Sequence, residues 1–273
     1  MSERPRSIEE LRLAGQLADV DLPRSAVRVL AACATAGDLT HDLLFHDPAA
    51  REAFLWLSGS PDCFSKPELR ATLLRTFVID HLAAAFGDRN PDALNVGIFP
   101  WLGTRSRRLR RARWVDIDAP PIAALRTHLL PQRPGLVQVA CSPLDFKWVD
   151  AVVGSSPRQL FLVLDESAVD LPAKRRIRLF DELVSRVAPG SELTMAFDER
   201  WGLRPTNWTD PVSALEFVVR EPGGASVHRY PRLRLVDARE YDETIRWSLV
   251  GLSSIARQRA GSRFVSVAHA RFV

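Results

Sequence analysis

The stretch ALNVGIFPWLGTR (residues 93–105) opens a pattern that decides the fold. From there, short apolar runs typical of buried strands alternate with segments of helical periodicity. In chain order the segments are ALNVGIF, RWVDID, IAALRTHLL, LVQVAC, QLFLVLD, PAKRRIRLFDELVSRV and SELTMAF. Strands that alternate with helices predict a mainly parallel sheet with helices on both of its faces.

Different patterns flank this α/β core. Four segments between residues 7 and 86 repeat apolar positions near the helical period, so we expect an N-terminal helical cap over residues 1–90 and the core over residues 91–273. The segment DERWGLRPTNWTDP (residues 198–211) breaks the periodicity and contains Trp201 and Trp208, which predicts a lid. The alternating pattern at residues 262–272 predicts an antiparallel last strand.

Size and composition indicate one domain. A chain of 273 residues with 46% hydrophobic content can bury one substantial core. No stretch approaches the ~20 apolar residues that span a bilayer, and the N-terminus MSERPRSIEE lacks the apolar segment of a signal peptide. We therefore expect a soluble, cytoplasmic protein without a membrane partner.

Cysteine and histidine spacing predicts neither disulfides nor a metal site. Three cysteines are too few and too scattered for a disulfide framework, and none forms a CxxC pair: Cys33, Cys63 and Cys141. The histidines show no HxH or HExxH spacing: His41, His46, His81, His128, His228 and His269.

The run RSRRLRRAR (residues 105–113) concentrates positive charge. A solvated helix face explains it better than a nucleic-acid site, because no aromatic residue interleaves the arginines. We therefore expect no nucleic-acid partner, while an acidic partner protein stays open.

Five stretches carry a resemblance to a known family: LLRTFVIDHL (73–82), LNVGIFPWLGTR (94–105), WVDIDAPP (114–121), SPLDFKW (142–148) and LVLDES (162–167). In order and spacing they resemble the leucine carboxyl methyltransferases and polyketide O-methyltransferases. That family typically shows Arg-Thr and Ile-Asp before the sheet, then an LGxGLDTR loop, ExDxP, Asp-x-x-Trp and EGxxxYL. The resemblance implies a class I methyltransferase-like (Rossmann-like) fold that binds S-adenosylmethionine.

Two of these motif positions can also be explained by physical chemistry, without the resemblance. A glycine after the first strand lets a ligand approach the backbone, which suits Gly97 and also Gly103. An acid at the end of the second strand can accept both hydroxyls of a ribose, which suits Asp118. We expect the neighbouring Asp116 to face the other side of the sheet, so that only one acid holds the ribose.

The resemblance implies roles for four further residues. Asp145 matches the residue that binds the adenine amino group, and Phe146 is placed to stack on the adenine ring. Glu166 matches the acid near the methionine end of the cofactor. Arg75 matches an arginine that meets the cofactor carboxylate, as a bidentate guanidinium can. No residue is singled out as catalytic.

Two functions remain open. The first is methylation of a hydroxyl or carboxylate of a small specialised metabolite, an anionic one included. The second is a repurposed fold that no longer uses S-adenosylmethionine, and instead catalyses cyclisation or elimination in natural-product biosynthesis or serves as a subunit of a complex. Phe99, Pro100 and Trp101 replace a family glycine and favour the second, and Asp165 with Glu166 would then act as acid and base. The oligomeric state, homomeric or heteromeric, is open.

Overall fold

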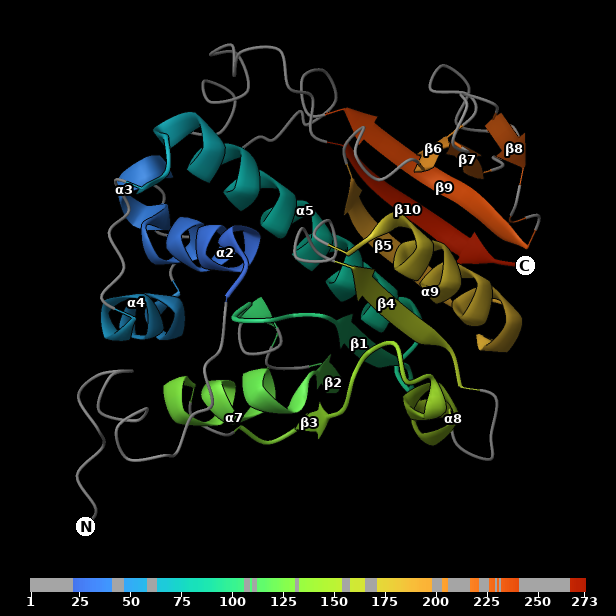
Figure 1. The fold of residues 1–273 in the computed structure, drawn as a ribbon, viewed down its shortest axis with the longest axis horizontal. Coiled ribbons are helices and arrows are strands. Elements are labelled where there is room, and N and C mark those ends of the chain that lie inside the picture. The colour runs from blue at the N-terminus through green and yellow to red at the C-terminus, as the bar shows by residue number, and fades with distance from the viewer. Residues whose placement is uncertain are drawn as a thin grey trace.

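A seven-stranded sheet dominates the fold (Figure 1). The computed structural model describes residues 22–40, 47–57, 63–105, 109, 112–130, 133–153, 158–164, 171–197, 203–205, 217–220, 226–228, 230, 232–240 and 266–273. The strands of the sheet are β1 (Leu94–Ile98), β2 (Trp114–Asp118), β3 (Leu136–Ala140), β4 (Leu160–Leu164), β5 (Glu192–Phe197), β9 (Leu233–Glu240) and β10 (Ser266–Phe272).

The strand order confirms the class I methyltransferase-like sheet expected from the sequence. The spatial order is β3-β2-β1-β4-β5-β10-β9, with β1 to β5 parallel and β10 antiparallel to both of its neighbours. The antiparallel last strand predicted for residues 262–272 is β10. The direction of winding reverses between β1 and β4, and ligands of such sheets bind at that switch point, beyond the carboxyl ends of the strands.

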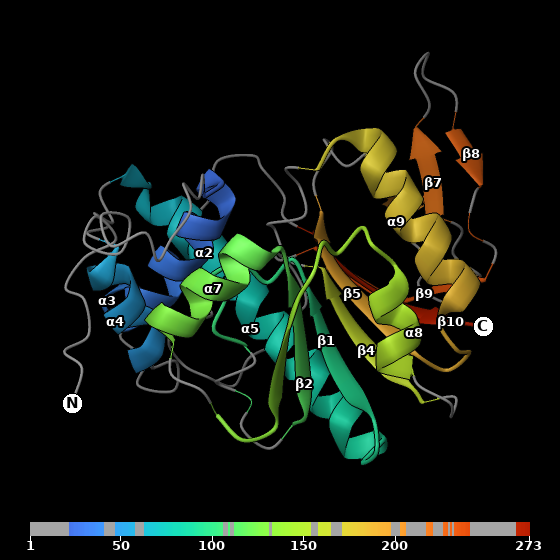
Figure 2. The ribbon, with the colours of Figure 1, turned by 60° about the horizontal axis from the view of Figure 1, so that its bottom comes forward.

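Helices cover both faces of the sheet, and its central strands are buried on both sides. All residues of β1, β2 and β4 are buried. On one face, helices α8 (Lys147–Val153) and α9 (Ala173–Arg186) pack on residues such as Val96, Ile117 and Leu162. On the other face, helix α5 (Lys66–Arg89) packs on Trp114, Phe161 and Val163 (Figure 2).

A second apolar cluster lies beside the sheet. It joins α2 (Arg24–Ala34), α3 (Ala36–Thr40), α4 (Pro48–Trp56) and the first half of α5 to helix α7 (Pro120–Leu129), which follows β2. Leu102, in the loop after β1, belongs to this cluster. The loop after β1 is therefore held between the sheet and the N-terminal helices. No helix in the described ranges is long and apolar enough to cross a membrane.

Three short strands form a separate antiparallel sheet, in the order β6 (Leu203–Pro205), β7 (Phe217–Arg220) and β8 (Ser226–His228). Strand β6 falls inside the segment expected to be a lid. Apart from β6, the residues of that segment, including Trp201 and Trp208, lie outside the described part of the chain.

Candidate functional site

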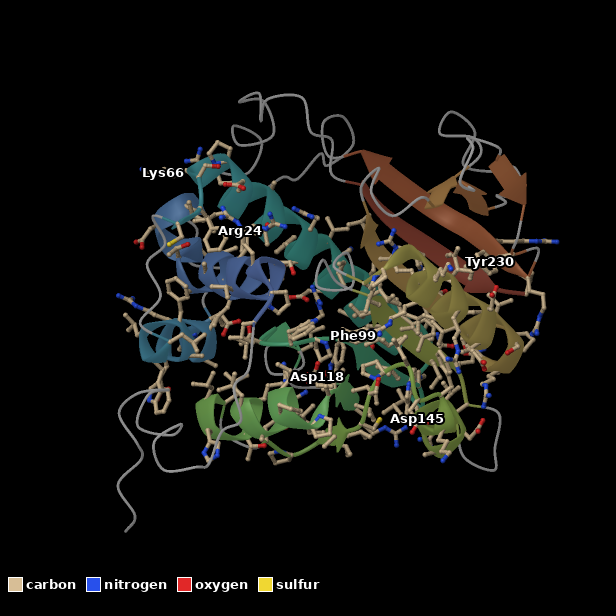
Figure 3. All side chains as sticks on the ribbon, viewed as in Figure 1. Arg24, Lys66, Phe99, Asp118, Asp145 and Tyr230 are labelled. Carbon is tan, nitrogen blue, oxygen red and sulfur yellow. The ribbon has the colours of Figure 1, made fainter. Side chains whose placement is uncertain are left out.

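The loop at residues 99–105 follows β1 directly and lies at the switch point of the sheet. The backbone N–H of Phe99 donates to the carbonyl of Ile117 at 3.2 Å, so the loop begins as a continuation of the β1–β2 pairing. Figure 3 shows Phe99 and Asp118 close together at the centre of the molecule, above α7, with Asp145 farther away beside α8. This loop occupies the place where the resemblance puts a glycine-rich cofactor loop.

Two bulky residues of the loop hold a backbone conformation that normally belongs to glycine. The φ angles of Phe99 and Trp101 are 54° and 47°. For a residue with a Cβ, the left-handed region costs about 1–2 kcal/mol. The two rings stack with their centroids 6.5 Å apart, and Phe99 is buried in the apolar cluster under α8 and α9. Packing therefore holds the loop in a shape that its residues disfavour locally.

Asp118 is the last residue of β2, and its side chain is closed off from solvent. Its exposed fraction is 1%. One carboxylate oxygen, Oδ1, accepts the backbone N–H of Trp101 at 3.2 Å, and the other, Oδ2, meets no hydrogen-bond donor in the described part of the chain. Burial raises the pKa of Asp118 well above its ordinary value, against the charge of Arg126 and the Trp101 hydrogen bond. The residue expected to bind ribose is thus engaged by the protein's own loop.

Arg126 on α7 holds this arrangement together, although it was not among the residues predicted from the sequence. Its guanidinium donates to the carbonyl oxygens of Trp101 and Gly103, and forms an ion pair with Asp116 at 2.5 Å. Its Nε lies 3.7 Å from Oδ2 of Asp118. A signal existed, because Arg126 falls in the apolar stripe of α7, where a charged residue indicates a buried partner.

The expectation that Asp116 faces away from Asp118 was wrong. Both acids meet the guanidinium of Arg126. Residues two apart on a strand point to the same face of the sheet, so the two carboxylates share one side. Their common partner is an arginine of the protein.

Gly97 sits beneath this ion pair. A Cβ built at Gly97 would lie 2.7 Å from Oδ1 of Asp116 and 3.3 Å from the Cβ of Pro100. The close approach over Gly97 is therefore made by the carboxylate of Asp116 in this structure, whereas the sequence predicted an approach by a ligand.

The Gly97→Ala variant is expected to lose about 1–3 kcal/mol of unfolding free energy, because Arg126 keeps the Asp116 carboxylate from moving aside. Urea denaturation followed by circular dichroism measures the change. Gly87→Ala is a matched control in an open position of α5, where alanine should stabilise by up to ~1 kcal/mol. If both variants unfold at the same urea concentration, the packing over Gly97 is not tight.

The far end of the loop is fixed to the N-terminal helices. The hydroxyl of Thr104 donates to Oδ2 of Asp47, whose Oδ1 caps helix α4 through the N–H of Ala50. Arg105 forms an ion pair with Asp80 of α5 at 2.5 Å, and both side chains are largely buried. The interpretation of the arginine run as a solvated face is therefore wrong for Arg105.

The structure places the other expected cofactor residues in different surroundings. Arg75, on α5, is half-buried and donates to Ala71 and Thr72 of its own helix. Asp145 is exposed in the turn before α8. Phe146 is buried, and the guanidinium of Arg178 lies 5.5 Å from the centre of its ring. Glu166 and Asp165 lie outside the described residues. Of the residues expected at the site, Asp118 and Gly103 contact Arg126, and Gly97 packs against the Asp116 carboxylate that Arg126 binds.

A small cavity opens beside the centre. It is lined by Gly97, Pro100, Gly103, Arg105, Trp114, Asp116 and Val163, and leaves room for about one water molecule. Sites for cofactors usually enclose about 300–1,000 Å³. The acid of β2 has the right chemistry for a ribose, but the described loop covers it. S-adenosylmethionine therefore fits the chemistry of Asp118 only if the loop moves.

Comparison with known proteins adds one partial match. No protein-family model matches the chain. The O-methyltransferase TcmP of tetracenomycin polyketide synthesis from Streptomyces glaucescens is 28% identical over 93 residues, which are 33% of this chain and 34% of the relative. The chain thus matches about a third of the length of this curated relative.

Two solved methyltransferase structures are similar to this chain at low sequence identity. The N-methyltransferase NodS from Bradyrhizobium japonicum gives a TM-score of 0.41 at 14% identity and covers 71% of this chain and 93% of its own. The methyltransferase CcbJ from Streptomyces caelestis gives 0.40 at 14% identity and covers 78% and 98%. We assign the fold from the strand order of the sheet. The chain has a class I methyltransferase-like fold and resembles a polyketide O-methyltransferase over a third of its length.

Proposed function

We propose that this protein binds S-adenosylmethionine at the carboxyl ends of β1, β2 and β4, and methylates a hydroxyl or carboxylate of a small molecule. The observation that carries the proposal is Asp118, a carboxylate at the end of β2 beside the switch point of the sheet. The partial likeness to TcmP also supports an oxygen as the acceptor.

The buried polar groups at and around Asp118 are consistent with this role. Oδ2 of Asp118 meets no donor within the described ranges, so it can accept a hydrogen bond from a ligand hydroxyl. When bound, the cofactor would supply an electrophilic methyl group. The protein would then have to align the acceptor oxygen and exclude water. Arg126, Asp116 and Asp118 form a preorganised cluster of polar groups at the bottom of such a site.

A repurposed fold is the second candidate, and the loop at residues 99–105 favours it. Phe99 and Trp101 fill the place of a glycine loop, and the loop is bound at Asp118, Arg126, Asp47 and Asp80. A protein that kept this loop closed would bind no S-adenosylmethionine.

Calorimetric titration with S-adenosylmethionine distinguishes the two functions. If the first holds, we expect binding in the micromolar range, about −8 kcal/mol. Asp118→Asn should weaken it by ~1–3 kcal/mol, because a neutral amide is a poorer acceptor for the ribose hydroxyls. The exposed Asp150→Asn is the control, since Asp150 contacts Arg186 on the surface. A folded native protein that produces no heat at millimolar ligand would favour the repurposed fold.

A further inference from the structure

The loop that replaces the glycine-rich segment competes for the acid that a cofactor would need. The backbone N–H of Trp101 occupies Oδ1 of Asp118, and the side chain of Asp118 is 1% exposed. Oδ2 has no donor, but Asp118 is closed off from solvent, so a ribose hydroxyl cannot reach its carboxylate unless the loop that contacts it moves. The closed loop and a bound nucleoside therefore exclude each other.

Two buried polar atoms next to this contact remain unmatched. Oδ2 of Asp118 and Nε of Arg126 meet no hydrogen-bond partner in the described part of the chain, and both residues are 1% exposed. The two atoms lie 3.7 Å apart, too far for a direct hydrogen bond. Buried polar groups are nearly always satisfied in folded proteins. The closed state therefore leaves a hydrogen-bonding deficit that a ligand at Asp118 would relieve.

Contacts at both ends of the loop favour the closed state. Arg126 binds the carbonyl oxygens of Trp101 and Gly103, and Asp47 accepts the hydroxyl of Thr104. The left-handed backbone of Phe99 and Trp101 disfavours it. Opposed contributions of this kind bring the free energies of the closed and open loop closer together.

We propose that residues 99–105 form a self-occluding gate, in which Trp101 holds Asp118 until a nucleoside cofactor displaces it. This proposal rests on the proposed function and adds a regulation of the same site. The affinity measured for the cofactor is the intrinsic affinity of the open state reduced by the fraction of molecules that are open. Residues that stabilise the closed loop therefore weaken cofactor binding without touching the cofactor.

Titration with S-adenosylhomocysteine tests the gate. Phe99→Gly together with Trp101→Gly removes the ring packing and permits other loop conformations, so we expect affinity about tenfold above that of the native protein, as for a gate that is about 10% open. Thr104→Val removes the hydroxyl that binds Asp47 and should raise affinity severalfold. Thr104→Ser keeps the hydroxyl and is its matched control. Circular dichroism shows whether each variant is folded.

The outcomes separate the gate from the proposed function. Tighter binding by the glycine variant and by Thr104→Val, but not by Thr104→Ser, supports the gate. If all forms bind S-adenosylhomocysteine equally well, the gate is wrong and the proposed function stands. If none binds while all are folded, both are wrong. If the glycine variant does not fold, the Thr104 pair decides in the same way.

Discussion

Replacing Arg126 by methionine is expected to lower the free energy of unfolding by about 3–5 kcal/mol, because it leaves two buried carboxylates without their partner. The loop carbonyls of Trp101 and Gly103 lose their donor as well. Methionine keeps most of the side-chain length, so the change removes charge and hydrogen bonds more than volume. Chemical denaturation at neutral pH measures the loss.

Arg186→Met is the matched control for this variant. Arg186 contacts Asp150 and Glu182 at the surface, where solvent screens the charges, and its replacement should have a much smaller effect. Equal losses for the two variants would contradict a central role for Arg126. Arg126→Lys should fall between the native protein and Arg126→Met, since an ammonium keeps the charge but cannot reproduce the fork of donors.

The loss in Arg126→Met should depend on pH in a predictable direction. Burial already raises the pKa of Asp118, and Arg126 opposes that rise. Without Arg126 the folded-state pKa of Asp118 should rise further above its value in the unfolded chain. Stability is then greatest at acidic pH and falls as the pH rises toward the folded-state pKa. A variant that instead lost stability on acidification would show that Asp118 is not the affected group.

The mainly parallel sheet between helical layers was predictable because it depends on patterns spread over many residues. Strand β4 (LFLVL) is apolar on both faces, as a strand between two helical layers requires, and all residues of β1 and β2 are buried as well. A single unusual residue changes such a pattern little. The alternation in β10 likewise predicted a strand at the end of the chain.

The candidate site was predictable only in part, because its contacts join distant segments. Gly97 and Asp118 could be placed near strand ends, but their neighbours are the Asp116 carboxylate over Gly97 and, from α7, Arg126, which binds both acids. Sequence spacing gives no distance between a loop and a helix. The left-handed backbone at Phe99 and Trp101 was unpredictable for a related reason, since aromatic residues avoid it unless tertiary packing imposes it.

Another buried carboxylate, Glu192, lies at the opposite end of the parallel strands, where β5 begins. Glu192 is 2% exposed and contacts three bases: His269 at 2.8 Å, Arg271 at 2.7 Å and Arg89 at 3.0 Å. Burial by itself raises the pKa of Glu192, but hydrogen bonds from His269 and Arg271 and the nearby positive charges outweigh it and hold the pKa at about 2. The cluster joins β5, β10 and the end of α5.

Acidification is therefore expected to weaken the fold through Glu192. The folded pKa of about 2 lies below the ordinary value of 4.5, so the stabilisation is fully present above that ordinary value and is lost as the pH falls toward 2. The shift corresponds to roughly 3 kcal/mol at neutral pH, an upper value because Arg89 and Arg271 are half-exposed.

Glu192→Gln removes the titrating group and tests this linkage. Its unfolding free energy should be lower than that of the native protein by about 2–3 kcal/mol at neutral pH, and the difference should shrink as the pH approaches ~3. Denaturation curves at several pH values give both quantities. Asp150→Asn, which removes a surface partner of Arg186, should leave the pH dependence close to native. A difference that stays constant with pH would mean that Glu192 stabilises the fold by packing, because only a carboxylate with a lowered pKa loses its contribution on protonation.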